Sequence, residues 1–166
     1  RRHSDRAARH RKNLPGPDQR IHFYDKQAPH YSFTNFSPHP VIYKDKEYPT
    51  SEHLFQAFKF MKHKPHLAER IRLCSGSPRG ALQEAQGLRA DARHDWKDVS
   101  VEKMEKALWH KFTQHRDLRR ELLDTGDAVL IENSPTDSFW GIGKDGKGRN
   151  ELGKALMRLR MELAGY

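Results

Sequence analysis

The sequence predicts an α+β fold: a mostly helical single domain with a small β-sheet. Two observations favour helices. Apolar residues recur every three or four positions over long stretches, and these stretches begin at residues that cap helices. A third observation adds the sheet, because Ala128-Val129-Leu130-Ile131 is a short apolar run typical of a buried strand. At 166 residues, the chain is long enough to form one domain with a substantial core.

The first elements of the domain are expected to be extended. Residues 21–24 predict a first strand, and residues 31–36 predict a further extended segment. Two β-rich pieces at 41–43 and 47–48 flank a polar turn at 44–46, which predicts a small hairpin.

The elements that follow are predicted to be helices, apart from the strand at 128–131. The first runs from about Thr50 to Lys64, where Pro65 disfavours further helix in the residue before it. Further helices are expected at residues 65–74, 78–88, 100–112, 118–123 and from about 150 to the C-terminal end. The apolar faces of the two longest consist of Val101, Met104, Leu108 and Phe112, and of Leu152, Leu156, Leu159 and Leu163.

Basic charge is concentrated at the N-terminus. The formal net charge is +9, and residues 1–20 hold seven Lys or Arg against two Asp or Glu. This segment has almost no apolar residues, so we expect a disordered basic tail over residues 1–20 and the folded domain over residues 21–166. The tail is interpreted either as a solvated linker or as a nuclear signal or an arm that contacts the phosphates of DNA or RNA.

The single cysteine and the lack of long apolar runs restrict the class of protein. One cysteine excludes an internal disulfide and a thiolate zinc cluster, and we expect Cys74 to be a buried structural thiol beside Leu67 and Ile71. No apolar run reaches the length of a membrane span, so no membrane partner is expected. These features favour a reducing intracellular compartment, cytoplasmic or nuclear.

A narrow polar stripe on the helix that begins at Thr50 is the first candidate site. Glu52, Gln56, Lys59 and His63 follow one another at spacings of four, three and four residues, beside an otherwise apolar surface. Such a stripe faces either water or a polar cleft. The positive end of the helix dipole favours an ionised Glu52, and Lys59 lies roughly 10 Å further along the axis. A small substrate could lie between them.

A second candidate site follows the strand at 128–131. Ser134 and Asp137 have the spacing of a helix-capping pair, which by itself explains Asp137. Trp140 and Gly141 come next, and a glycine there would let a ligand approach the backbone. An indole beside a carboxylate suits a nucleobase, although the motif taken alone favours a buried core tryptophan.

The sequence offers no metal or nucleophile motif. The basic, glycine-rich loop at residues 143–150 either holds a phosphate or is an ordinary turn at Asp145-Gly146. The eleven histidines include no HExxH pair, and no Gly-x-Ser-x-Gly elbow is present. We therefore expect chemistry without a metal or cofactor, using a carboxylate, a lysine and aromatic rings.

Taken together, these residues resemble the NADAR family, whose fold is called YbiA-like. The resemblance covers roughly residues 21–164 and is specific because many blocks occur in the right order. The blocks are Phe33-Thr34-Asn35-Phe36, Pro49-Thr50-Ser51-Glu52-His53, Phe55-Gln56-Ala57, Lys59-Phe60, Trp96, Lys111-Phe112, Leu122-Leu123-Asp124-Thr125-Gly126, Glu132, Ser134-Pro135, Asp137, Trp140-Gly141, Gly143, Asn150, Leu152-Gly153 and Leu156-Met157. Thr34 stands where the family more often has serine, which keeps the hydroxyl.

The resemblance implies an N-glycosidase that cuts the bond between C1 of a ribose and the nitrogen of a base. Family members act on phosphoribosylamino-pyrimidine intermediates of riboflavin synthesis, or remove ADP-ribose from ADP-ribosylated guanine in nucleic acid. The resemblance implies Glu52 as the acid–base carboxylate. It also implies a base pocket of Trp96, Asp137 and Trp140 beside Gly141, with Asn35 and Asn150 orienting the sugar or phosphate.

Two questions stay open from the sequence. Lys59 would act either as a cation that holds Glu52 or a phosphate, or as a neutral amine that forms a Schiff base with the opened sugar. The second role needs a lowered pKa, whereas pairing with Glu52 raises it. The competing class of function is a non-catalytic module that binds ADP-ribose or nucleic acid. Catalysis also requires that Glu52 and Trp140 face one solvent-accessible hollow.

Overall fold

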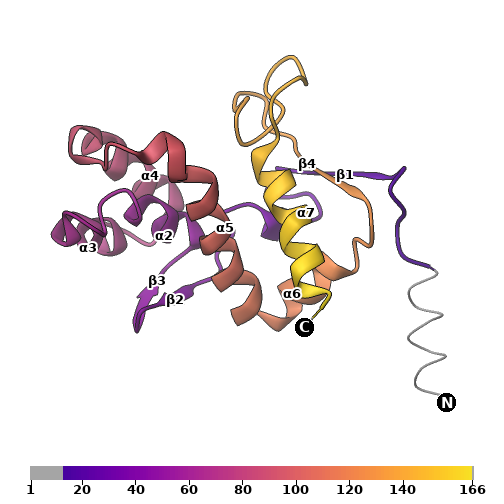
Figure 1. Ribbon diagram of the computed structural model, residues 1–166, viewed down its shortest axis with the longest axis horizontal. Helices are drawn as coiled ribbons and strands as arrows, with labels where there is room; N and C mark the ends of the chain where they lie inside the picture. Colours follow the sequence, from indigo (N-terminus) through magenta and orange to yellow (C-terminus); the bar gives the residue numbers. More distant parts are fainter. Residues whose placement is uncertain (1–12, 166) are drawn as a thin grey trace. The chain divides into compact units, whose positions relative to one another are not determined.

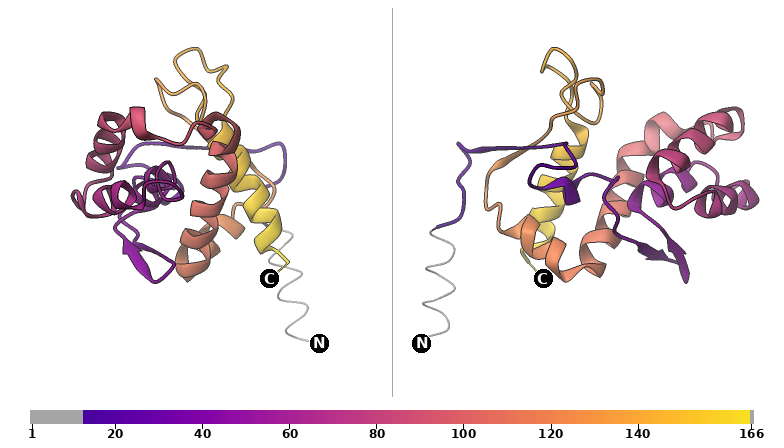
Figure 2. Two further views of the ribbon diagram at one scale, coloured as in Figure 1. Left: turned by 60° about the vertical axis from the view of Figure 1, so that its left-hand side comes forward. Right: turned by 180° about the vertical axis from the view of Figure 1, so that it is seen from behind.

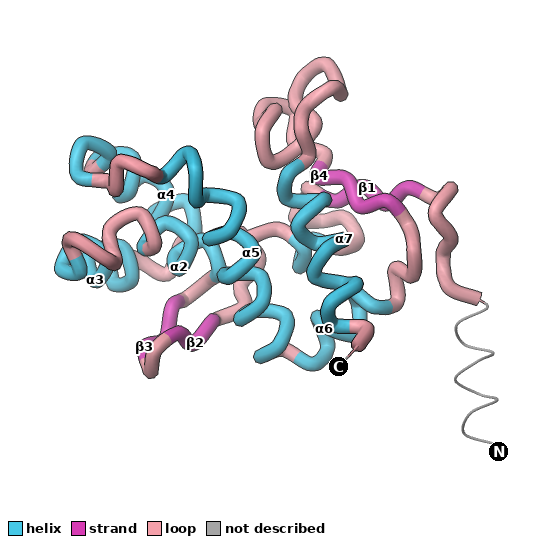
Figure 3. The backbone as a smooth tube through the Cα atoms, viewed as in Figure 1, coloured by secondary structure: helices cyan, strands magenta, loops and turns pink. Residues whose placement is uncertain are grey.

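The computed structural model describes residues 13–165. By their internal contacts these residues form two compact units, one made of Asp25–Arg116 and the other of residues 13–24 with 117–165. Both units are rich in helix, and each includes one two-stranded sheet (Figure 3). The α+β class, mostly helical with little sheet, is therefore confirmed.

The unit Asp25–Arg116 is built around a short central helix, α2 (Ser51–Ala57). Helices α3, α4 and α5 and the β2–β3 hairpin all pack against α2, and α3 lies beside α4 (Figures 1 and 2). In chain order the elements are η1 (Tyr31–Phe33), β2 (Val41–Tyr43), β3 (Lys46–Tyr48), α2, α3 (Pro65–Leu73), α4 (Pro78–Gly87), η2 (Arg89–Asp91) and α5 (Trp96–Gln114). Every residue of α2 is buried, so side chains on several of its faces are shielded from bulk water.

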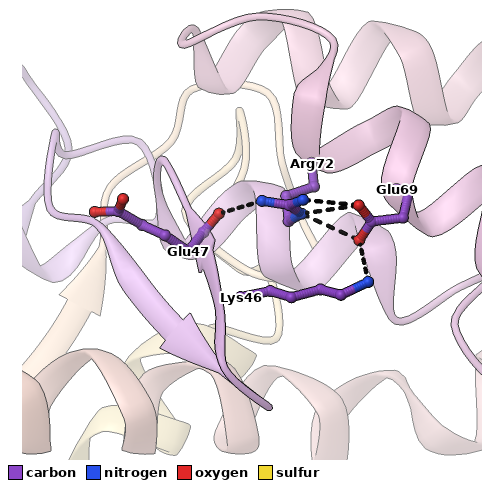
Figure 4. Close-up of polar contacts among 4 residues, drawn as sticks. All are labelled: Lys46, Glu47, Glu69 and Arg72. Carbon is purple, nitrogen blue, oxygen red and sulfur yellow. Dashed lines mark hydrogen bonds and ion pairs between the residues drawn. The ribbon is translucent and has the colours of Figure 1, made fainter.

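The hairpin is held to α3 by an ionic cluster (Figure 4). Glu69 accepts hydrogen bonds from Lys46 Nζ at 2.8 Å and from Arg72 Nη2 at 2.7 Å, and Arg72 Nη1 reaches the carbonyl of Glu47 at 3.2 Å. The hydrogen bonds from Arg72 and Lys46 lower the pKa of Glu69 to about 2. The cluster joins residues that are 23 and 25 positions apart in sequence.

The other unit combines β1 (Arg20–Phe23), β4 (Val129–Glu132) and α7 (Glu151–Leu163) with α6 (Arg116–Leu123), whose first residue is the last of the unit Asp25–Arg116. Strands β1 and β4 pair in parallel, with Ile21 opposite Leu130 and Phe23 opposite Glu132. Helix α7 packs against β4 (Figure 1). The pairing places Glu132 at the carboxyl end of the strand.

Three predicted elements differ from those in the structure. Tyr31–Phe33 is a 3₁₀ helix rather than an extended segment. Helix α2 ends at Ala57, and residues 58–63 form turns instead of further helix. Phe58 and Phe60 are both buried within these turns. Helix α5 begins at Trp96, four residues earlier than predicted.

Two further expectations are corrected. Cys74 is exposed rather than buried, because it follows the last turn of α3 and so lies beyond the helix face that Leu67 and Ile71 bury. The disordered tail was predicted to extend to residue 20, yet Asp127 donates its N–H to Pro15 at 2.8 Å and Val129 donates to Gln19 at 2.9 Å. Residues 1–12, where most of the predicted tail lies, are outside the described residues.

Candidate active site

Helix α2 presents Glu52 in its first turn. Thr50 caps the helix by accepting the N–H of His53 at 3.2 Å. The Glu52 side chain is only 6% exposed. Its backbone N–H donates to the carbonyl of Asn35 at 3.2 Å, and the Asn35 amide oxygen accepts the hydroxyl of Ser51 at 2.9 Å. Asn35 therefore fixes the start of the helix that carries Glu52.

The segment that carries Asn35 is itself held by a buried lysine. Lys111 on α5 is 0% exposed, and its ammonium donates to Ser32 O at 2.6 Å, Thr34 O at 2.7 Å and Ser37 Oγ at 2.7 Å. These three acceptors bracket Asn35. Sequence reasoning used Lys111 only as part of a family block, since nothing in the local pattern distinguishes a buried lysine from an exposed one.

Gln56 lies one turn after Glu52 and contacts it directly. The Gln56 Nε2 donates to Glu52 Oε1 at 2.7 Å, and the Gln56 side chain is 3% exposed. The polar stripe predicted on this helix thus begins with a hydrogen-bonded pair of buried side chains. His63 does not continue the stripe, because its Nε2 pairs with the carbonyl of Asp91 at 2.7 Å.

Lys59, in the turns that follow α2, lies beside Trp96, the first residue of α5. The Lys59 Nζ is 5.5 Å from the centroid of the Trp96 ring, and the Trp96 ring is 5.1 Å from that of Phe55. The carbonyl of Lys59 accepts the N–H of Arg93 at 2.9 Å, which fixes the turn to the residues that precede α5. Burial lowers the pKa of Lys59, and the nearby charge of Glu52 opposes that shift without cancelling it.

A second cluster of predicted site residues follows β4. The hydroxyl of Ser134 accepts the N–H of Asp137 at 3.0 Å. Asp137 Oδ1 in turn accepts the N–H groups of Phe139 at 2.9 Å and Trp140 at 2.8 Å. These bonds stabilise a loop rather than the helix start that the spacing predicted. The rings of Phe139 and Trp140 meet edge to face at 4.8 Å, and the Arg149 guanidinium lies 5.0 Å from the Phe139 ring.

Glu132, which sequence reasoning had not singled out as a site residue, is a buried carboxyl in this second cluster. It is 7% exposed, and its Oε2 accepts the N–H of Ser134 at 3.3 Å. Burial raises the pKa of Glu132 to about 7, and the charge of Asp137 acts in the same direction. A carboxylic acid at the end of an otherwise apolar strand was the available sequence signal.

The positions of Gly141 and Asn150 have structural explanations. A side chain on Gly141 would overlap the Glu132 carboxyl, so the absent side chain makes room for that carboxyl. Asn150 bonds the backbone of β4 at both ends of its amide, accepting from Glu132 N and donating to Leu130 O, each at 2.9 Å. Their predicted contacts with substrate stay predictions.

The glycine-rich loop at 143–150 folds back on the residues that precede it. Backbone N–H groups from Gly146 to Leu152 donate to oxygen atoms of the protein, among them the Asp145 carboxylate, which accepts from Lys147 at 2.9 Å. These N–H groups are not directed at an anion, so the structure favours the ordinary turn over the phosphate-binding loop. Within residues 13–165, no group of three His, Cys, Asp or Glu side chains is placed to hold a metal ion.

The predicted residues thus fall into two sets. Asn35, Glu52, Lys59 and Trp96 come together in the unit Asp25–Arg116, whereas Asp137, Trp140, Gly141 and Asn150 come together in the other. The expectation that Glu52 and Trp140 face a common hollow stays a prediction. The geometry of the first set is that of a site able to transfer a proton, with a buried carboxyl, a lysine of lowered pKa and an indole.

Comparison with known proteins identifies the family. The model of the NADAR domain matches residues 22–164. The chain belongs to the NADAR family. The N-glycosidase Npun_R5314 of Nostoc punctiforme is 41% identical over 143 residues, which are 86% of this chain and 92% of that protein. The N-glycosidase YbiA of Escherichia coli K12 is 42% identical over 147 residues, 89% of this chain and 90% of that protein.

A solved structure and a longer relative complete the comparison. The NMR structure of E. coli YbiA superposes with a TM-score of 0.80 at 41% identity, covering 89% of this chain and 86% of that one. The fold of this NADAR chain is therefore YbiA-like. The riboflavin biosynthesis protein VVA0006 of Vibrio vulnificus is 40% identical over 146 residues, 88% of this chain but 39% of that protein. No helix among the described residues has the length and apolar character needed to cross a membrane.

Proposed function

We propose that this NADAR chain is an N-glycosidase that hydrolyses the bond between C1 of a ribose and the nitrogen of a base. The observation that carries the proposal is the buried Glu52 carboxyl in the first turn of α2, close enough to Lys59 to influence its pKa. Relatives named N-glycosidases match almost the whole domain at 41–42% identity, which supports the same reaction class here.

Glu52 is the acid–base group in this proposal. When the bond between C1 and the base nitrogen breaks, positive charge develops on the sugar while the leaving nitrogen takes the electron pair. A carboxylate near C1 stabilises that charge and takes a proton from the water that adds to C1. The carboxylic acid formed in this way then passes the proton to the leaving base. Helix α2 aids the ionised form because its first turn carries partial positive charge.

Lys59 is the nucleophile in the covalent form of this mechanism. Its neutral amine attacks C1, the bond from C1 to the base breaks, and the base leaves with a proton. The bond between C1 and the ring oxygen of this adduct then breaks and the ring oxygen takes up a proton, which gives a Schiff base between Lys59 and the opened sugar. Water adds to the Schiff base and releases the sugar and the free amine. The lowered pKa of Lys59 supports this role, because it increases the fraction of neutral amine near neutral pH.

ADP-ribosylated guanine in nucleic acid is the proposed substrate. Indole rings such as Trp96 suit a flat base, and the net charge of +9 favours association with a phosphate backbone. The second candidate is a phosphoribosylamino-pyrimidine of riboflavin synthesis, which is favoured by the 40% identity to a riboflavin biosynthesis protein. Incubating the chain with each substrate and measuring the freed base by chromatography distinguishes the two.

Glu52→Gln tests the proposal. We expect turnover to fall by at least about 100-fold because the amide can neither accept nor deliver the proton. The thermal unfolding midpoint should stay close to that of the unmodified chain, which separates lost chemistry from lost folding. Near-normal turnover by a folded Glu52→Gln variant would remove Glu52 from the mechanism.

A further inference from the structure

A buried acceptor in Gln56 has no partner within the described residues. Its side-chain oxygen, Oε1, is shielded from solvent and receives no hydrogen bond. The residue as a whole is only 3% exposed. Leaving such an amide oxygen unpaired destabilises the folded chain, which is why buried polar groups are almost always hydrogen-bonded. An unpaired acceptor in a candidate active site therefore points to a donor that arrives with the ligand.

The orientation of the Gln56 amide is determined by its neighbour. The Nε2 group donates to Glu52 Oε1 at 2.7 Å. Rotating the amide by half a turn would place its oxygen against a carboxylate oxygen, and two acceptors repel each other. With Nε2 directed at Glu52, Oε1 points away from the Glu52 carboxyl. Because Oε1 and Nε2 belong to the same amide group, Oε1 still lies close to the carboxyl that is proposed to act at C1.

The position of Oε1 indicates which donor it meets. A ribose carries its 2′-hydroxyl on the carbon next to C1, so a carboxyl that acts at C1 has this hydroxyl close by. Hydrogen bonds to the hydroxyl next to the reacting carbon strengthen in the transition state of glycoside cleavage. The 2′-hydroxyl is therefore the substrate donor nearest to the Glu52–Gln56 pair.

We propose that Gln56 Oε1 accepts a hydrogen bond from the 2′-hydroxyl of the ribose, so that the site cleaves ribosides and rejects 2′-deoxyribosides. This inference rests on the proposed N-glycosidase function and names the sugar that the site takes. A site built to pair a hydroxyl rejects the analogue that lacks it, because its own buried acceptor is then left unpaired. An enzyme that works on DNA would in this way spare the glycosidic bonds of the DNA itself.

The proposal is tested with a pair of substrates and a pair of variants. The substrates are a riboside that the unmodified chain cleaves and its 2′-deoxy counterpart, and the measured quantity is the ratio of their kcat/KM values. Gln56→Met keeps the size of the side chain but removes the acceptor. We expect the preference for the riboside to fall at least tenfold in Gln56→Met, as is typical for the loss of one buried hydrogen bond.

Ser51→Ala is the matched control. Ser51 is also buried and precedes Glu52, but its hydroxyl contacts Asn35. We expect Ser51→Ala to change both rates in proportion and to preserve the ratio. An unchanged ratio in a folded Gln56→Met variant would overturn the inference.

The unmodified chain provides a second measurement that does not depend on the variant folding. It should cleave the 2′-deoxy compound at least tenfold less efficiently than the riboside, and equal efficiency would also overturn the inference. If the chain cleaves neither compound nor any other riboside, it is the proposed function that fails.

Discussion

Two opposed effects set the pKa of Lys59, and burial is the larger. A neutral amine is the reactive form in the covalent mechanism, so we expect the rate to rise with pH and level off below the ordinary lysine value. Reduction with borohydride during turnover should trap the sugar on Lys59, as detected by mass spectrometry.

Lys59→Arg separates the two roles of this residue. Arginine keeps the positive charge but cannot form the Schiff base, so trapping and turnover should both be lost. Lys62→Arg, at an exposed position three residues later, is the matched control and should leave both intact. Full turnover by Lys59→Arg without an adduct would instead assign Lys59 the role of a cation.

Glu132 is expected to make stability fall as pH rises. Its pKa is about 7 in the folded chain and near 4.5 when exposed, so the folded state holds the proton more tightly. The protonated Glu132 therefore stabilises the folded state fully below pH 4.5, and this contribution to the free energy of unfolding is lost as pH rises through 7. Glu132→Gln removes this trend, and above pH 7 it should be more stable than the unmodified chain by on the order of 2 kcal/mol.

Urea denaturation at pH 5 and pH 8 measures that difference. Glu102→Gln, a change at an exposed glutamate of α5, should show no comparable dependence on pH. Equal pH profiles for Glu132→Gln and the unmodified chain would mean that Glu132 is ionised without penalty in the folded state.

At the scale of single residues, the sequence indicates which side chains are candidates for catalysis better than it indicates which residues those side chains contact. Glu52 and Lys59 could be proposed from their helical spacing and from family blocks. The sequence could not show that the Gln56 oxygen is unpaired or that Lys111 is buried, because both facts depend on residues far away along the chain. Cys74 was misjudged for the same reason, since its apolar neighbours in sequence do not cover it.

Among the elements, the segment at residues 31–37 depends most on one distant side chain. Lys111→Met would leave three acceptors, Ser32 O, Thr34 O and Ser37 Oγ, without their ammonium donor. We expect the free energy of unfolding to fall by about 3–5 kcal/mol, as when one partner of a buried charged contact is removed.

Chemical denaturation measures this loss, and Lys97→Met is the control. Lys97 is an exposed lysine on the same helix, so its replacement should change stability by less than about 0.5 kcal/mol. A loss of the same small size for Lys111→Met would mean that the segment keeps its conformation without the ammonium.

Helices with strong local signals could be predicted, whereas segments shaped by tertiary contacts could not. Ser77 caps α4 and Pro78 opens it, as the sequence indicated. The 3₁₀ turn at Tyr31–Phe33 gave no such signal, because the carbonyl groups of this segment turn toward Lys111 on another helix.

For the molecule as a whole, fold class and family were both accessible from sequence. The period of the apolar residues in α7 and the run at β4 were sufficient for the α+β class, and the ordered blocks were sufficient for the NADAR family. The parallel pairing of β1 with β4 was not predicted, since more than 100 residues separate Phe23 from its partner Glu132. Substrate choice also depends on contacts between residues that are distant in sequence, so it could not be predicted from the sequence.

The exposed thiol of Cys74 has a practical consequence. Since the chain holds one cysteine, a thiol-specific fluorophore or spin label would attach at a single known point, just after α3. That point belongs to the same compact unit as Glu52 and Lys59. A probe there would test in real time whether nucleic acid, the carrier of the proposed substrate, binds the chain, without any engineered cysteine.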